Sequence, residues 1–314
     1  MNETTPETET DTQHADDSAT IATAPDAGAE DQGAPASAAT AKPTLTEATL
    51  PGGVYYRRWD VESPRAIALI VHGLGEHSGR YQHVAEALAA RGIASVAPDH
   101  PGHGQSPGER CYIGSFDEFF VALDQLAGQM QDAHPGLPMF IIGHSMGGLI
   151  TGNYILDRQH KFAGAAFSGA AFEVPEPPAA AAIFINKLIA MILPKLGVLQ
   201  LDASEVSRDK EVVTRYMEDP LVHSGKISAK LVVELFSAMG ALETRRGAIE
   251  LPVLIMHGEG DVMAAPDGSV NFHKNISSED NTLRLYPTLY HEIFNEPEQD
   301  DVLKELCDWL EARL

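Results

Sequence analysis

Short runs of apolar residues alternate with longer amphipathic segments along most of this chain. The runs are rich in β-branched residues or alanine and are bounded by polar or glycine-containing turns, a pattern typical of buried strands. They lie at Ala66–Val71, Ile93–Pro98, Met139–Ile142, Phe162–Phe167, Val253–Met256 and Thr282–Tyr286. Helical periodicity fills most of the gaps, at Tyr81–Arg91, Phe116–Ala133, Met146–Leu156 and Asp300–Leu314. This alternation predicts an α/β domain whose mostly parallel sheet is covered by helices on both faces.

The alternation stops between about residues 172 and 247. An Ala- and Leu-rich stretch, Ala179–Leu193, has helical periodicity but does not lead into another strand. Turns rich in Asp and Ser follow it, and a second helical stretch lies near Ala229–Met239. We therefore expect a helical cap inserted between two core strands. Lys187, Pro194 and Lys195 argue against a membrane-spanning helix here, and no run of about 18 apolar residues occurs in the chain.

The first 43 residues differ in composition from the rest. Up to Lys42 they include no aromatic residue, and their nine acidic residues face that single lysine. Such a segment buries too little apolar surface to offset its ordering entropy, so we predict a disordered acidic tail at residues 1–43 and one domain at residues 44–314. The tail has neither the basic start nor the apolar stretch of a secretory signal.

The net charge limits the possible binding partners of the protein, and the cysteine content limits its possible cellular compartment. The formal net charge of −23 opposes binding to nucleic acid and electrostatic capture by anionic lipids. Any contact with a membrane would therefore have to be hydrophobic. The two cysteines, Cys111 and Cys307, do not make a disulfide framework. We expect a cytoplasmic protein, with peripheral contact at a membrane surface as an open alternative.

A nucleophile motif follows one of the predicted strands. Gly143-His144-Ser145-Met146-Gly147 fits the pattern G-x-S-x-G, and it lies between the strand Met139–Ile142 and a helical stretch. A sharp turn between strand and helix projects the serine hydroxyl above the sheet. A second match surrounds Ser106, but Pro107 follows it and has no N–H to donate to a developing oxyanion. Ser145 is therefore the predicted nucleophile, and Ser106 is a loop serine.

Two backbone N–H groups are candidates for an oxyanion hole. The first belongs to Met146, the residue after the nucleophile. The second should come from a loop after an earlier strand, and His72-Gly73-Leu74-Gly75 follows Ala66–Val71 directly. We therefore expect the N–H of Leu74 to be the second donor.

A serine nucleophile needs a base, and the base needs a carboxylate that fixes its tautomer. With a nucleophile elbow, the chain order is serine, then the acid, then histidine. Asp261 lies in the loop that leaves the strand Val253–Met256, where the orienting acid is expected. Glu259 and Asp267 lie nearby and remain alternatives.

His291 is the predicted base. It follows the last strand, Thr282–Tyr286, and precedes the C-terminal helix. The chain has 13 histidines, but after Asp261 only His273 competes, and it falls inside a helical run. His77, His100 and His103 with Asp99 lack the spacing of a closed zinc site, so we predict neither a metal nor any other cofactor.

Several motifs occur in order between about Val54 and the C-terminus. They are His72-Gly-Leu-Gly-Glu-His-Ser-Gly-Arg-Tyr81, Asp99-His-Pro-Gly-His-Gly-Gln-Ser106, Gly143-His-Ser-Met-Gly-Gly148, Leu193-Pro-Lys-Leu196, Ser207-Arg-Asp-Lys210, Asp219-Pro-Leu-Val222 and Tyr290-His-Glu-Ile-Phe-Asn-Glu296. Together they resemble the monoacylglycerol lipases, serine hydrolases of the α/β-hydrolase superfamily. The acidic tail has no counterpart among these motifs.

The resemblance implies an α/β-hydrolase fold and hydrolysis of a monoacylglycerol to glycerol and a fatty acid. It also implies a polar glycerol pocket, at positions that correspond to Glu76, Arg80, His144 and Tyr216 here. Glu76 and Arg80 are four residues apart, so an ordinary ion pair that supports the loop is the other interpretation.

The apolar cap stretch has two interpretations as well. It can line an acyl tunnel and touch lipid aggregates, as the resemblance implies, or it can pack on the core. A lysophospholipase or a broad carboxylesterase would use the same triad with another head-group preference. A non-catalytic lipid-binding relative would lack a triad member, and all three positions are filled here.

Overall fold

The computed structural model describes residues 42–314, and its centre is an eight-stranded sheet. Its strands are β1 (Thr44–Thr49), β2 (Tyr55–Asp60), β3 (Ala66–Val71), β4 (Ile93–Pro98), β5 (Met139–His144), β6 (Gly164–Ser168), β9 (Val253–Gly258) and β10 (Asn281–Tyr286). The order across the sheet is β1-β2-β4-β3-β5-β6-β9-β10, antiparallel at β1 and β2 and parallel from β4 onward.

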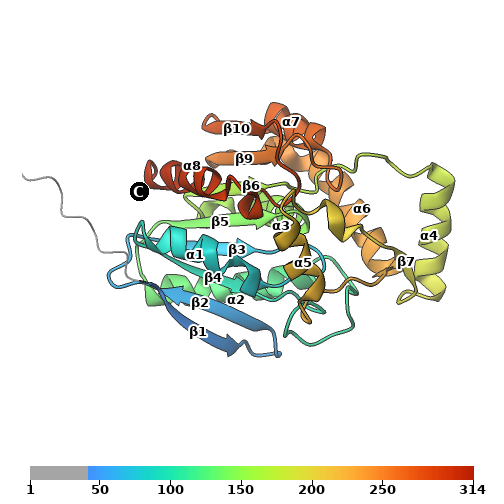
Figure 1. Ribbon diagram of the computed structural model, residues 1–314, viewed down its shortest axis with the longest axis horizontal. Helices are drawn as coiled ribbons and strands as arrows, with labels where there is room; N and C mark the ends of the chain where they lie inside the picture. The colour runs from blue at the N-terminus through green and yellow to red at the C-terminus, as the bar shows by residue number, and fades with distance from the viewer. Residues whose placement is uncertain (1–41) are drawn as a thin grey trace, which may run out of the picture. The chain divides into compact units, whose positions relative to one another are not determined.

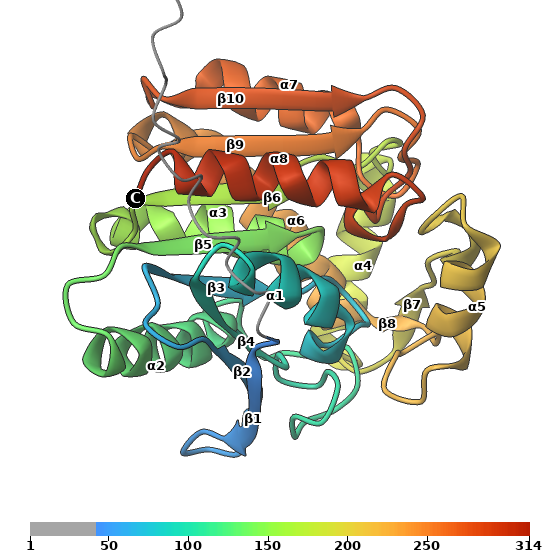
Figure 2. The same ribbon diagram turned by 60° about the vertical axis from the view of Figure 1, so that its left-hand side comes forward.

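Helices cover both faces of this sheet (Figure 1). One face carries α1 and α8, and the other carries α2, α3 and α7 (Figure 2). Their bounds are α1 (Gln82–Ala89), α2 (Glu118–Ala133), α3 (Met146–Arg158), α7 (Pro266–Asn275) and α8 (Gln299–Glu311). Strands β3, β4, β5 and β9 are buried along their whole length, because helices remove both of their faces from water. This is why they read as continuous apolar runs instead of alternating ones.

The segment between β6 and β9 forms a group of helices and two short strands at the carboxyl end of the parallel strands (Figure 2). Its elements are α4 (Ala180–Ile192), β7 (Gly197–Leu199), α5 (Lys210–Glu218), β8 (Ile227–Ser228) and α6 (Ala229–Arg245). Helix α6 packs on both α3 and α4, so it connects this cap segment to the core. Short 3-10 turns join several elements, at Ser78–Tyr81, Gln159–Lys161, Ala203–Glu205, Arg246–Ala248 and Ile293–Asn295.

Most predicted strands and helices occur within a few residues of their expected bounds. The strand expected at Phe162–Phe167 begins later, at Gly164, because a 3-10 turn occupies Gln159–Lys161. The antiparallel pair β1 and β2 was not predicted; its strands are polar and half-exposed, so they lack an apolar run. Helix α5 was expected to be a turn region; it is short and polar, with only Val212 buried.

Other expectations concern the termini, the cysteines and the membrane. The predicted disordered tail lies almost entirely outside the described residues. Cys111 and Cys307 are both free and buried. No helix within residues 42–314 is long and apolar enough to cross a membrane.

Candidate active site

Ser145 lies at the sharp turn between β5 and α3. Its backbone has φ 54° and ψ −121°, a strained combination for a residue with a side chain. The turn is tight because Gly147 packs against the end of β3, where a Cβ would clash with the carbonyl oxygen of Val71. Glycine is therefore required at position 147, and the chain holds the Ser145 hydroxyl at the carboxyl end of the sheet.

Three side chains from three separate loops meet at this point. His291 Nε2 lies 2.8 Å from Ser145 Oγ, and His291 Nδ1 lies 2.6 Å from Asp261 Oδ2. His291 and Asp261 are each 4% exposed. The arrangement fits a serine whose proton can pass to a histidine held in one tautomer by a carboxylate.

Every lone-pair direction of the Asp261 carboxylate is occupied. Oδ1 accepts the backbone N–H groups of Met263 and Ala264, at 2.8 and 3.0 Å. Oδ2 lies within hydrogen-bond distance of His291 and of the buried His257, whose Nε2 is 3.0 Å away. The other ring nitrogen of His257 lies 2.6 Å from the hydroxyl of Ser269. Because of these contacts, the carboxylate has one fixed orientation toward His291.

The pKa values of Asp261 and His291 follow from this environment. Burial opposes ionisation of Asp261, but His291 and His257 outweigh it and hold the pKa of the carboxyl well below its usual range. Burial also opposes protonation of His291, yet the Asp261 carboxylate raises the pKa of His291 above 6.5. A histidine with a raised pKa is a stronger base toward the serine proton.

The loop after β3 lies beside Ser145. A Cβ at Gly73 would be only 3.1 Å from the Ser145 Cβ, so Leu74 follows a residue that touches the nucleophile. Glu76 holds this loop, because its Oε1 accepts the Gly73 N–H at 2.6 Å and the Tyr81 hydroxyl at 2.7 Å. Neither the Leu74 N–H nor the Met146 N–H donates to another group of residues 42–314. Both donors are therefore free for a ligand.

Glu76 and Arg80 form an ion pair, 2.7 Å apart, which was the alternative to a role in the glycerol pocket. Arg80 also makes a bidentate pair with Glu292, at 2.6 and 2.7 Å, and stacks on the Tyr216 ring with its guanidinium 4.6 Å from the centroid. Burial raises the pKa of Glu76, but Arg80, together with smaller effects of His144, His72 and the Tyr81 hydroxyl, outweighs it and lowers that pKa to about 2. Arg80 thus joins the loop after β3, the residue after His291 and cap helix α5.

Two further predicted residues retain a free polar group. His144 Nδ1 lies 2.9 Å from the Ser168 carbonyl oxygen, which leaves Nε2 as an acceptor. Burial, followed by the nearby His291, lowers the pKa of His144 to about 4, so its ring is neutral near pH 7. The Tyr216 hydroxyl has no hydrogen-bond partner among the described residues. Neutral acceptors and hydroxyls of this kind suit a polyhydroxyl ligand.

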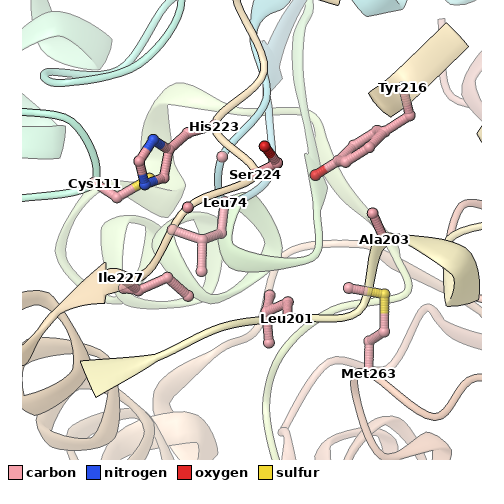
Figure 3. Close-up of a pocket in the computed structure, with 11 residues that line it drawn as sticks. Leu74, Cys111, Leu201, Ala203, Tyr216, His223, Ser224, Ile227 and Met263 are labelled. Carbon is pink, nitrogen blue, oxygen red and sulfur yellow. The ribbon is translucent and has the colours of Figure 1, made fainter. Parts of the chain in front are cut away.

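Two neighbouring cavities lie under the cap. The smaller one has a volume of about 20 Å³. Figure 3 shows its lining, which includes Leu74 from the loop after β3 and Tyr216 from α5. Leu201 and Met263 line it too, and both also line a larger cavity of about 810 Å³. The larger cavity has mostly apolar walls, including Ile183 and Ile189 from α4 and Val232 and Phe236 from α6. Its size and lining suit a long alkyl chain.

The other candidates that the sequence offered lie apart from the Ser145, His291 and Asp261 side chains in the hydrogen-bond pattern. Ser106 Oγ accepts the Tyr55 N–H and donates to the Asp99 carbonyl oxygen. His273 lies on α7, and Glu259 and Asp267 are exposed. Within residues 42–314 no group of three His, Cys, Asp or Glu side chains is placed to hold a metal ion.

Sequence reasoning missed four side chains around the proposed base and acid. They are His257, Ser269, Glu292 and Glu296, all less than 5% exposed. What distinguishes these residues is that their polar side chains are buried near the end of a core strand. Burial is visible only in the fold, so the sequence carried no signal for them.

Comparison with known proteins identifies the family. The family model described as serine aminopeptidase, S33 matches residues 62–298. A monoacylglycerol lipase of Mycolicibacterium smegmatis is 37% identical over 84% of this chain and 95% of its own. The chain belongs to the monoacylglycerol lipase family. A human monoglyceride lipase is 33% identical over 83% of this chain and 87% of its own.

Solved structures of this family agree with the architecture. The crystal structure of Paleococcus ferrophilus monoacylglycerol lipase superposes with a TM-score of 0.76 at 33% identity. The superposition covers 83% of this chain and 99% of the Paleococcus ferrophilus chain. The expected α/β-hydrolase fold is therefore confirmed.

Proposed function

We propose that this protein hydrolyses monoacylglycerols to glycerol and a free fatty acid through an acyl-enzyme on Ser145. The chain is a carboxylic ester hydrolase by family. The observation that supports the roles of its residues is the hydrogen-bonded series Ser145, His291 and Asp261. An apolar cavity of about 810 Å³ is lined in part by Val262 and Met263, which directly follow Asp261 in the chain.

The reaction proceeds in two steps. His291 Nε2 takes the Ser145 proton while Oγ attacks the ester carbonyl carbon, and the Leu74 and Met146 N–H groups stabilise the oxyanion. His291 then gives the proton to the departing glycerol oxygen, which leaves the acyl group on Oγ. A water molecule, deprotonated by His291, attacks the acyl carbon, and Ser145 regains its proton as the fatty acid departs.

The acyl chain and the glycerol group of the substrate would bind in two different places. The acyl chain would pass Leu201 and Met263 into the larger cavity. The glycerol hydroxyls would bind near His144 Nε2 and the Tyr216 hydroxyl, with Arg80 and Glu76 fixing the surrounding loop. Paired polar groups in a desolvated site discriminate strongly against substrates that leave them unpaired.

A substrate panel tests this assignment. We expect the purified protein to prefer a long-chain monoacylglycerol over diacylglycerol, lysophospholipid and an aryl acetate, in kcat/KM. Tyr216→Phe should raise KM for monoacylglycerol several-fold, because one lost hydrogen bond costs about 1 kcal/mol. The same variant should leave KM for the aryl acetate unchanged. Equal activity of wild type on lysophospholipid would favour the lysophospholipase alternative, and activity on the aryl acetate alone would leave a general esterase.

Helix α4 is the surface that we propose for contact with lipid aggregates. Met191 and Ile192 are 80% and 77% exposed, and Phe184 is 63% exposed, although all three are apolar. Exposed apolar side chains on one helix of a protein with net charge −23 favour a hydrophobic contact over an electrostatic one.

Vesicle binding tests the role of α4. With neutral phosphatidylcholine vesicles in a sedimentation assay, we expect Met191→Glu together with Ile192→Glu to lower the bound fraction at least five-fold. Turnover of a soluble aryl acetate should change less than two-fold. Val121→Glu is the control, because Val121 is 58% exposed on α2, which is not part of the cap segment. Unchanged sedimentation of the double variant would exclude α4 as the contact.

A further inference from the structure

One part of the cap is bound directly to the loop that carries His291. The Glu292 N–H donates to the Val206 carbonyl oxygen at 2.8 Å, and the Ser207 hydroxyl donates to the Asn295 carbonyl oxygen at 3.2 Å. Val206 and Ser207 are buried, although they belong to the cap segment between α4 and α5. The cap therefore contacts the segment around the base, in addition to covering the cavity.

The Glu296 carboxylate is the centre of this contact. It is 1% exposed, and its Oε1 accepts the Tyr290 N–H at 3.0 Å and the Arg208 N–H at 3.0 Å. Its Oε2 accepts Arg208 Nε at 2.8 Å. Tyr290 immediately precedes His291, so one carboxylate holds the backbone beside the base and two donors from the cap.

The Arg208 guanidinium completes the link. It pairs with both Glu296 and Glu298, and its side chain is 29% exposed. A buried carboxylate is stable as an anion only if its charge is compensated. Arg208 is the one cation that forms an ion pair with Glu296 among residues 42–314. Without the Arg208 side chain, the Glu296 charge would therefore be compensated only by the two backbone N–H groups.

We propose that Glu296 is a positioning residue for His291, and that its pair with Arg208 makes the alignment of the base depend on the cap. The proposal rests on the role of His291 as the base. It has a specific consequence: a substitution in the cap slows turnover even of a substrate too small to reach the cap cavity. Misplacement of a reacting group by about 1 Å is enough to cost about 100-fold in rate.

The test uses Arg208→Ala and Glu296→Gln, with an aryl acetate and a long-chain monoacylglycerol as substrates. Turnover is expressed per active serine, titrated with a fluorophosphonate, so that misfolded molecules are not counted. We expect kcat to fall about 10- to 100-fold on both substrates, with KM for the acetate within about two-fold of wild type. Arg208→Lys keeps the charge and should recover part of the loss.

The double variant and a matched control sharpen the result. Because the pair acts as a unit, Arg208→Ala combined with Glu296→Gln should be no slower than the slower single variant. Arg245→Ala removes another cap arginine, one that pairs with the exposed Asp157, and should leave kcat unchanged. A purely structural pair would lower the melting temperature and the number of titrated serines while leaving kcat per serine at the wild-type value.

Two failures remain distinguishable. If wild type hydrolyses none of the esters, the proposed function is wrong. If wild type is active but kcat per titrated serine is unchanged in both Arg208→Ala and Glu296→Gln, only the positioning role is wrong. An increase of KM for monoacylglycerol alone would also overturn it, because the cap would then act on substrate binding and not on the base.

Discussion

Replacement of Ser145 by alanine should lower kcat for a long-chain monoacylglycerol by about 10⁶-fold, the size of loss seen when a serine nucleophile is removed. The acyl-enzyme needs an oxygen on this side chain, and His291 Nε2, 2.8 Å from Oγ, would have no proton to accept. The measurement is single-turnover hydrolysis of purified protein, together with labelling by a fluorophosphonate.

The chain provides its own control for this variant. Ser106 lies in a second G-x-S-x-G match, but its hydroxyl is engaged by the Tyr55 N–H and the Asp99 carbonyl oxygen. Ser106→Ala should therefore label and turn over like wild type, apart from any loss of stability. If Ser145→Ala still accepted the label on a serine, the nucleophile would lie elsewhere.

Asp261→Asn should lower kcat by about 10⁴-fold with little change in KM. An amide in this place directs N–H groups or a weaker acceptor toward His291 Nδ1, so the ring no longer holds its proton on the nitrogen that faces residue 261. The base then presents the wrong tautomer to Ser145. Steady-state kinetics on monoacylglycerol measure the effect.

Glu259→Gln and Asp267→Asn test the alternatives left open by the sequence. Both carboxylates are exposed, whereas Asp261 is 4% exposed and makes four hydrogen-bond contacts. We expect each control to keep wild-type turnover within about two-fold. A loss of activity in either one that matched Asp261→Asn would reassign the orienting acid.

Much of this site could be predicted because its residues follow core strands. Ser145 follows β5, Asp261 follows β9 and His291 follows β10. Strands β5 and β9 are buried along their whole length and are clear features of the sequence, and the carboxyl ends of parallel strands lie at one edge of the sheet. Strand β10 is only partly buried, and His291 was selected as the histidine between that strand and the C-terminal helix.

The elements that were not predicted are those without a strong apolar pattern. Strands β1 and β2 are half-exposed at the edge, and α5 buries only Val212, so neither carries a strong apolar pattern. The choice between the two interpretations of the α4 stretch also needed the fold. Ile183 and Ile189 line the cavity under the cap, whereas Met191 and Ile192 point to solvent.

Local sequence was sufficient to predict the parallel strands of the sheet and to select Ser145, Asp261 and His291, which the structure brings together, because strand periodicity and strand ends are short-range features. Only the tertiary structure decided which buried polar groups support them. Glu296 meets Arg208 across 88 positions, and Arg80 meets Glu292 across 212. No local pattern encodes such pairs, since each partner by itself is an ordinary charged residue, and its burial and its partner arise only when the cap and the loop after β10 come together.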